Sequence, residues 1–121
     1  MHKTILLVSR DLKLQATRAS MLERAGYRTM RTTSLVSAIA LAPHCQMSII
    51  GHTFAFAEQN DFIDSVHEAN PSVFVLCLRY GLAQPSVLLK HVEDCFRAQP
   101  GGSRICVIER KNVVAWPKKA S

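Results

Sequence analysis

The sequence predicts an α/β fold, a three-layer sandwich in which helices cover both faces of a parallel sheet. Two observations along the 121 residues lead to this prediction. Short, unbroken apolar runs recur, and they alternate with segments whose apolar residues have helical spacing. A strand with one wet face would alternate polar and apolar residues, so unbroken runs indicate strands that are buried on both faces. Their alternation with amphipathic helices is typical of parallel sheets with helical crossovers.

The first strand, within Lys3–Asp11, is expected at the centre of the sheet because its four middle residues are all apolar. Ser9, Arg10 and Asp11 follow directly. Asp11 can cap a helix over residues 12–25, since its side chain can accept hydrogen bonds from free backbone N–H groups. Open α/β sheets bind ligands at the carboxyl ends of their strands, so we expect any functional site at this turn.

The later elements follow from the same patterns. Tyr27–Thr33 has β-branched and aromatic residues but no continuous apolar run, which is typical of an exposed edge strand. The first helix should turn Leu14, Thr17, Met21, Leu22 and Ala25 toward the core and stop at Gly26. The remaining expected elements are a short helix from Ser34 to Pro43, a strand at Met47–Ile50, a helix whose clearer part starts at Asn60 or Asp61 and ends at Asn70, and a strand at Val73–Leu78.

The pattern is ambiguous after the fourth strand. Only Arg79–Ala83 separates it from Pro85, a good first helical residue. A parallel fifth strand needs a crossover of a dozen or more residues, so we expect the helix over residues 85–98 to be that crossover and Arg104–Glu109 to be the fifth strand. By its sequence alone, the same helix could instead be the last one of the fold. A single domain over residues 3–110 and a tail over residues 111–121 are expected.

Composition narrows the function classes. No segment is apolar over the roughly 18–20 residues that span a bilayer, and no signal peptide is recognisable at the N-terminus, so a cytoplasmic protein is expected. The cysteines have no C-x-x-C spacing, and we expect neither disulfides nor a zinc site. The net charge of +6 comes from basic ends and an acidic middle, with Lys and Arg at dispersed positions. Such a basic surface leaves nucleic-acid binding open, although no nucleic-acid-binding motif is present.

The segment ILLVSRD at residues 5–11 resembles the opening ILLVDDD of the receiver domains of two-component response regulators, and the order of later elements supports the likeness over residues 3–98. The resemblance implies a flavodoxin-like sheet with strand order 2-1-3-4-5, altered after the fourth strand. In that family, two acidic residues after the first strand hold a magnesium ion. An aspartate at the end of the third strand accepts a phosphoryl group. A Thr or Ser and a Lys, at the ends of the fourth and fifth strands, complete the site.

The sequence departs from the family at these site positions. The residues that align there are Ser9 and Arg10 for the paired acids, Asp11 for a third and less critical position, Gly51 for the phosphoacceptor, Cys77 for the Thr or Ser, and Gln84 for the Lys. Gly51 offers no carboxylate nucleophile, and an arginine such as Arg10 cannot bind magnesium. The resemblance therefore implies a receiver framework without receiver chemistry, which is a degenerate receiver or pseudo-receiver.

Two alternatives involve chemistry or charge. Cys77 and His52 end neighbouring strands and could form a nucleophile–base pair, which would need the histidine to lower the pKa of the thiol. A nucleic-acid binder would rely on Arg10, Arg18 or the tail lysines. No glycine-rich phosphate-binding motif follows any strand, and no histidines have metal-ligand spacing.

The sequence favours a stand-alone regulatory module that binds another protein without being phosphorylated. We expect no enzymatic activity, no cofactor and no bound metal. The expected partner is an unidentified signalling protein, with a homodimer as another arrangement, and neither nucleic acid nor a membrane. The predicted partner surface lies around the fourth strand, the following helix and the tail. Its residues are Leu88, Val92, Phe96 and Trp116.

Overall fold

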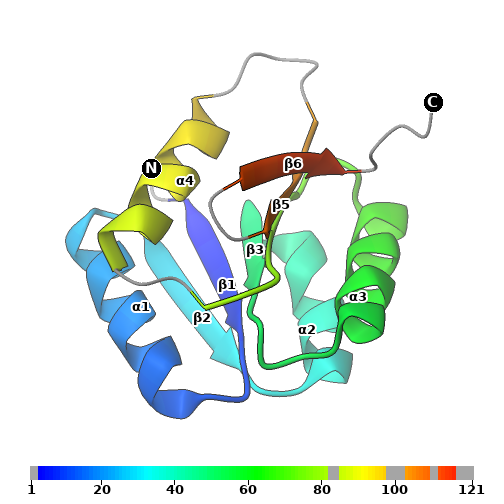
Figure 1. Ribbon diagram of the computed structural model, residues 1–121, viewed down its shortest axis with the longest axis horizontal. Coiled ribbons are helices and arrows are strands. Elements are labelled where there is room, and N and C mark those ends of the chain that lie inside the picture. Colours follow the sequence, from blue (N-terminus) through cyan, green and yellow to red (C-terminus); the bar gives the residue numbers. More distant parts are fainter. Residues whose placement is uncertain (1–2, 82–84, 98–102, 110–111, 117–121) are drawn as a thin grey trace.

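The structure, a computed structural model, describes residues 3–81, 85–97, 103–109 and 112–116; for Pro85 and for residues 112–116 it describes the backbone alone. A six-stranded sheet of order β2-β1-β3-β4-β5-β6 forms the middle layer, and helices lie on both of its faces (Figure 1). The elements are β1 Thr4–Val8, α1 Leu12–Arg24, β2 Arg28–Thr32, α2 Leu35–Leu41, a short 3₁₀ turn Ala42–His44, β3 Met47–Ile50, α3 Phe56–Ala69, β4 Phe74–Leu78, α4 Pro85–Phe96, β5 Ile105–Glu109 and β6 Asn112–Trp116. The predicted parallel order 2-1-3-4-5 is confirmed.

Burial explains where each strand lies. β1, β3 and β4 pair on both sides, and nearly all their residues are buried. β2 pairs only with β1 among the described strands, and its residues are exposed or half-buried, as expected for an edge strand. Helix α1 ends as predicted, because Gly26 adopts a φ of 100°, which other residues rarely do.

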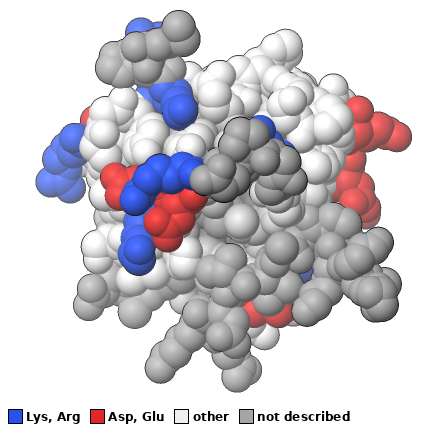
Figure 2. Space-filling view, turned by 90° about the horizontal axis from the view of Figure 1, so that it is seen from above, with Lys and Arg blue, Asp and Glu red and all other residues white. Residues whose placement is uncertain are grey.

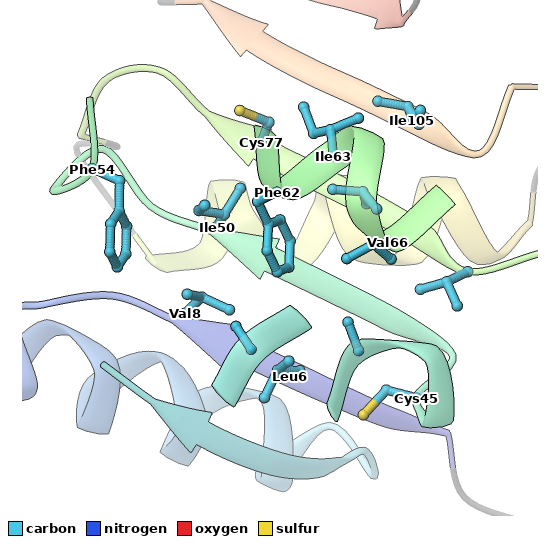
Figure 3. Close-up of a cluster of buried hydrophobic side chains, with 14 of the residues drawn as sticks. Leu6, Val8, Cys45, Ile50, Phe54, Phe62, Ile63, Val66, Cys77 and Ile105 are labelled. Atoms are coloured by element: carbon cyan, nitrogen blue, oxygen red, sulfur yellow. The ribbon is translucent and has the colours of Figure 1, made fainter. Parts of the chain in front are cut away.

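Two apolar clusters fill the spaces above and below the sheet. Helices α2 and α3 cover one face, where Phe62 and Val66 of α3 pack against side chains of β1, β3, β4 and β5 (Figure 3). Helices α1 and α4 cover the other face, where Leu22 and Leu88 pack against the opposite side chains of the same strands. Each central strand therefore contributes alternate residues to the two clusters, as the pleat of a strand requires.

Helix α4 lies on an unexpected face. The connections through α2, α3 and α4 all lead across the sheet in the same direction, yet α2 and α3 lie on one face and α4 lies beside α1 on the other (Figure 1). Connections between parallel strands are right-handed in about 98% of cases. Helix α1 lies on the other face from α2 and α3, and its connection leads across the sheet in the other direction. These two reversals cancel, so the connections through α1, α2 and α3 have the same hand. The β4–α4–β5 connection has the other hand and is left-handed.

This arrangement resolves the ambiguity after the fourth strand. The helix is the crossover to a parallel β5, as expected from the length of the connection. Its position beside α1 is nevertheless set by its apolar stripe, because Leu88, Val92 and Cys95 pack with Ala19 and Leu22 of α1. The apolar stripe of α4 indicated that this helix packs on the sheet, but not which face of the sheet it covers.

Regular structure extends beyond what the sequence pattern indicated at two places. Helix α3 begins at Phe56, four residues before Asn60, because the Glu58 carboxylate accepts a hydrogen bond from the backbone N–H of Ala55 (2.9 Å) and stabilises an earlier start. The segment expected to be a tail contains strand β6, Asn112–Trp116, which pairs antiparallel with β5.

In the part of the chain that the structure describes, no helix is long and apolar enough to cross a membrane.

Replacing Leu88 by alanine tests the packing of α4. Leu88 is 1% exposed, so its truncation should lower the free energy of unfolding by about 2–5 kcal/mol, measured by urea denaturation. Val87→Ala is the matched control, since Val87 is 40% exposed and its change should stay within about 0.5 kcal/mol. Equal, small effects at both positions would contradict the docking of α4 on the sheet.

Candidate functional site

The carboxyl ends of the parallel strands meet at one edge of the sheet, where the sequence predicted the site. Ser9 follows β1 and is buried, and its hydroxyl accepts a hydrogen bond from the backbone N–H of Asp11 (3.1 Å). The side chain of Asp11 caps α1, as predicted, by accepting from the N–H of Leu14 (3.0 Å). The Thr53 hydroxyl accepts from the backbone N–H of Arg10 (2.9 Å), so the turn after β1 is joined to the loop after β3.

Arg10 is held across this edge by several contacts. Its guanidinium donates to the backbone oxygen of Thr53 (3.2 Å), forms an ion pair with Glu58 (3.2 Å) and lies over the Phe54 ring at 4.3 Å. The hydrogen bond from Arg10, with that from the backbone of Ala55, holds the pKa of Glu58 below its usual value. Arg10, which the sequence analysis aligned with a metal-binding acid of the receiver family, thus links the first and third strand ends.

A second arginine, Arg18 of α1, reaches the end of β3. Arg18 is 5% exposed, and a Cβ atom placed on Gly51 would lie 3.4 Å from its Nη1 atom. Burial lowers the pKa of Arg18, while the charge of Asp11 opposes that shift. Among the described residues, none hydrogen-bonds its guanidinium. Gly51, which the sequence analysis aligned with the family's phosphoacceptor, therefore has a buried cation against it.

Two buried glutamines bind the strand ends. The Gln15 amide nitrogen donates to the backbone oxygens of Leu7 (3.1 Å), Ser9 (3.4 Å) and Thr32 (2.9 Å). Gln59 of α3 donates in the same manner to the backbone oxygens of Gly51 and Leu78, both at 2.9 Å. Each glutamine therefore fastens the ends of two neighbouring strands to a helix. These are the carbonyl groups that would otherwise be buried without partners.

Arg79, directly after β4, completes the edge. Its guanidinium donates to Oε1 of Gln59 (2.9 Å) and Oδ1 of Asn60 (2.8 Å), and it lies over the Phe56 ring at 4.7 Å. Arg79 is 7% exposed, so these charge-assisted contacts are largely shielded from water. The fourth strand end is in this way fixed to the start of α3.

The proposed nucleophile–base pair is not formed. Cys77 is fully buried within β4 and belongs to the apolar cluster with Ile63 and Ile105 (Figure 3). Burial raises the pKa of its thiol to about 11, with a small opposing effect of Arg79. His52 lies in the loop after β3 with its ring against Gly81. This alternative gains no support, because β4 is buried on both faces and Cys77 therefore lies in the core. The first exposed residue after this strand is Tyr80.

The predicted partner surface is also corrected. Leu88 and Val92 are 1% and 0% exposed within one chain, because they are the residues with which α4 packs on the sheet. Phe96 is half-buried and stacks between Tyr27 (ring centroids 5.6 Å apart) and Phe74 (5.5 Å). The backbone of Trp116 lies in β6, opposite Ile105, and its side chain is outside the described part of the chain, as is Gln84.

Sequence reasoning expected a site at this edge but did not identify several of the side chains that lie there. Gln15 and Arg18 are buried on α1 together with Ala19 and Leu22, so the buried stripe is turned by about one residue from the predicted one. Gln59 lies in the helical turn that the prediction left out. A signal was present, since Gln15 and Gln59 are each the fourth residue of a helix that follows a central strand, a position from which a long amide side chain can reach the strand's end.

Charge on the visible surface is dispersed. In Figure 2, Lys and Arg side chains lie in separate groups, some of them beside acidic ones, rather than in one continuous field. On α4, Asp94 pairs with both Lys90 (3.5 Å) and Arg97 (3.6 Å), which neutralises part of that basic charge. The nucleic-acid alternative gains no support from this face.

The arrangement limits the chemistry of the edge. Asp11 and Glu58 are both engaged, one as a helix cap and the other with Arg10. Across the residues that are described, no group of three His, Cys, Asp or Glu side chains could hold a metal ion. Gly51 carries no nucleophile. What the edge offers is a set of fixed cations and hydrogen bonds rather than a reacting group.

Comparisons with solved structures find the same fold in other proteins. Those similar to the chain include a CheY-like response regulator receiver domain protein from Methanospirillum hungatei JF-1 (TM-score 0.68, 15% identity, 78% of this chain and 93% of that chain). A receiver domain protein from Bacillus halodurans matches with a TM-score of 0.63 and 12% identity over 91% and 85% of the two chains. A putative pilus assembly-related protein from Burkholderia pseudomallei matches with a TM-score of 0.54 and 23% identity, over 75% of this chain and 71% of that chain. No protein-family model and no curated protein sequence matches the chain.

The chain therefore has the CheY-like receiver fold, a flavodoxin-like α/β architecture with five parallel strands. At these identities, the likeness concerns the fold. The strand-end residues described above are features of this chain.

Removing the amide of Gln59 should destabilise the protein. Gln59→Leu leaves the buried carbonyls of Gly51 and Leu78 without their donor, so the free energy of unfolding should fall by at least about 2 kcal/mol. Asp64→Leu makes a similar replacement at an exposed position of α3 and should change it by less than about 0.5 kcal/mol. Urea denaturation of both variants would show whether the two differ; a Gln59 variant as stable as its control would contradict the role of the amide.

The thiol of Cys77 should be inert in the folded protein. With its pKa raised to about 11, only about one molecule in 10⁴ carries the thiolate at pH 7, and the side chain is also inaccessible. Iodoacetamide labelling followed by peptide mass spectrometry should find Cys77 unmodified in the native state and modified in urea. Rapid native labelling would restore the nucleophile hypothesis.

Proposed function

We propose that this protein is a regulatory module that binds another protein and does so without aspartyl phosphorylation. The observation that carries the proposal is Gly51 at the end of β3, with the buried Arg18 guanidinium against it. Phosphoryl transfer at this position would need a carboxylate nucleophile and oxygen ligands for magnesium. Ser9 and Arg10 stand where the family's metal-binding acids would be.

The contacts at the strand ends support a single constitutive state. In a two-state switch, a ligand must bind one conformation better than the other. Here the loops after β1, β3 and β4 are joined by the protein's own side chains, those of Arg10, Gln59 and Arg79. These bonds provide internally what an ion and a phosphoryl group would otherwise supply.

We place the partner-binding surface at the same edge. Apart from Met30 on β2, the exposed large apolar residues of the described chain lie near the starts of the helices and in the loop after β4, on the carboxyl side of the sheet. They are Leu12, Val36, Phe56, Tyr80 and Val87. Phe56 and Tyr80 form an edge-to-face pair with ring centroids 6.1 Å apart. Aromatic residues beside arginines, such as Arg10, are enriched in protein interfaces. This surface replaces the one predicted around Leu88 and Val92.

A phosphoryl donor tests the first part of the proposal. The purified protein is mixed with Mg²⁺ and acetyl phosphate, or with beryllium fluoride, while intact mass and amide chemical shifts are recorded. We expect no mass gain and no saturable shifts at Ser9, Gly51 or Cys77. A phosphorylated species, or saturable shifts at these residues, would overturn the proposal.

Gly51→Asp should fail to restore phosphorylation. The new carboxylate would lie beside the Arg18 guanidinium and pair with it, and the metal-binding acids would still be missing. The same acetyl phosphate assay should therefore give no phosphorylated protein, with a folded state verified by circular dichroism. Phosphorylation of this variant would mean that Arg10 and Arg18 do not block the chemistry.

A further inference from the structure

Two cysteines far from the carboxyl edge lie close together. Cys95, in the last turn of α4, and Cys106, on β5, have Sγ atoms 3.7 Å apart. Both thiols are free. The other two cysteines are placed differently, since Cys77 is in the opposite apolar cluster and Cys45 lies against Met30. Cys95 and Cys106 are thus a local pair formed by the packing of α4 on the sheet.

The two thiols differ in their surroundings. Cys95 is 8% exposed, and Cys106 is half-buried, so a small reagent reaches Cys106 more readily. The hydrogen bond from the Cys95 thiol to Cys106 lowers the pKa of Cys106, and the same bond, with burial, raises that of Cys95. A thiolate is the nucleophile in disulfide exchange, and it attacks best where it is accessible.

We propose that Cys95 and Cys106 form a thiol–disulfide exchange site, in which Cys106 is the attacking cysteine and Cys95 the resolving one. The co-reactant is a small disulfide of the glutathione class. The Cys106 thiolate attacks one sulfur of that disulfide, forms a mixed disulfide and releases one thiolate. Cys95 loses its proton and attacks Sγ of Cys106, which expels the second thiolate. One protein disulfide forms, and two electrons pass from the cysteine pair to the small disulfide, which leaves as two thiols.

The geometry allows the bond with a small movement. The sulfurs must approach from 3.7 Å to about 2.05 Å, the length of a disulfide. Cys95 is the penultimate residue of α4, where helices adjust most easily because the last carbonyls have no helical partners. The bond would join α4 to β5 covalently and fix the end of the helix on which Phe96 stacks with Tyr27. This inference does not depend on the proposed function.

Oxidised glutathione is the probe that tests it. The reduced full-length protein is incubated with glutathione disulfide, quenched with acid, and then alkylated under denaturing conditions. We expect a mass loss of two hydrogens per chain, two fewer alkylated sites among the four cysteines, and a peptide that links Cys95 with Cys106. Failure to form this link in the folded protein, or a link between two different chains, would overturn the proposal.

Single variants assign the two roles. Cys95→Ser should stop the reaction at a glutathione adduct on Cys106, whereas Cys106→Ser should lose both the adduct and the internal bond. Cys45→Ser is the matched control and should form the bond as the unchanged protein does. An adduct that accumulates on Cys95 in the Cys106 variant would reverse the assignment and contradict the proposal. Circular dichroism verifies that each variant is folded. If a variant does not fold, the glutathione experiment on the unchanged protein still tests whether the Cys95–Cys106 bond forms.

Discussion

The carbonyl groups at the carboxyl edge of the sheet need hydrogen-bond donors, and the architecture of the site depends on how they obtain them. Gln15 and Gln59 provide those donors from α1 and α3. A buried carbonyl without a donor is costly, so each glutamine must keep its place and with it the helix that carries it. Arg79 then has a fixed partner in Gln59, and the loop after β4 follows from that contact. The edge is consequently organised by uncharged amides, with arginines arranged around them.

Much of the fold could be predicted because apolar runs report burial directly. Ile5–Val8, Met47–Ile50 and Val73–Leu78 are buried on both faces, and such strands have few positions to occupy in a parallel sheet. The cap at Asp11 and the stop at Gly26 are local features with known stereochemistry. The expectation of a site at the strand ends rests on the parallel topology of the sheet. These predictions concern properties that a short segment determines by itself.

The remaining features depend on contacts between distant segments. Nothing near Arg18 in the sequence indicates that its guanidinium reaches Gly51, because that contact exists only when β1 and β3 are neighbours. The burial of Cys77 likewise depends on a distant segment, because Ile63 of α3 belongs to the cluster that encloses its side chain. Strand β6 was not predicted because it forms only by pairing with β5, whose position in the sheet is set by more distant contacts. The face that α4 covers was likewise set by Leu22 of α1, which lies far from it in the sequence.

The left-handed connection to β5 also affects how the molecule can assemble. The elements from β1 to β4 form successive units whose contacts are short in sequence, and the cluster beneath α2 and α3 draws most of its side chains from them. The opposite cluster is different, since α1 covers only part of it until α4 arrives from near the other end of the chain. Contacts of such long sequence separation form late, after the entropy of closing the intervening loop has been overcome. While only the elements up to β4 have formed, one face therefore lacks just the β5 side chains Ile105 and Val107 of its described cluster. The other face stays open to water beside α1 until α4 packs there.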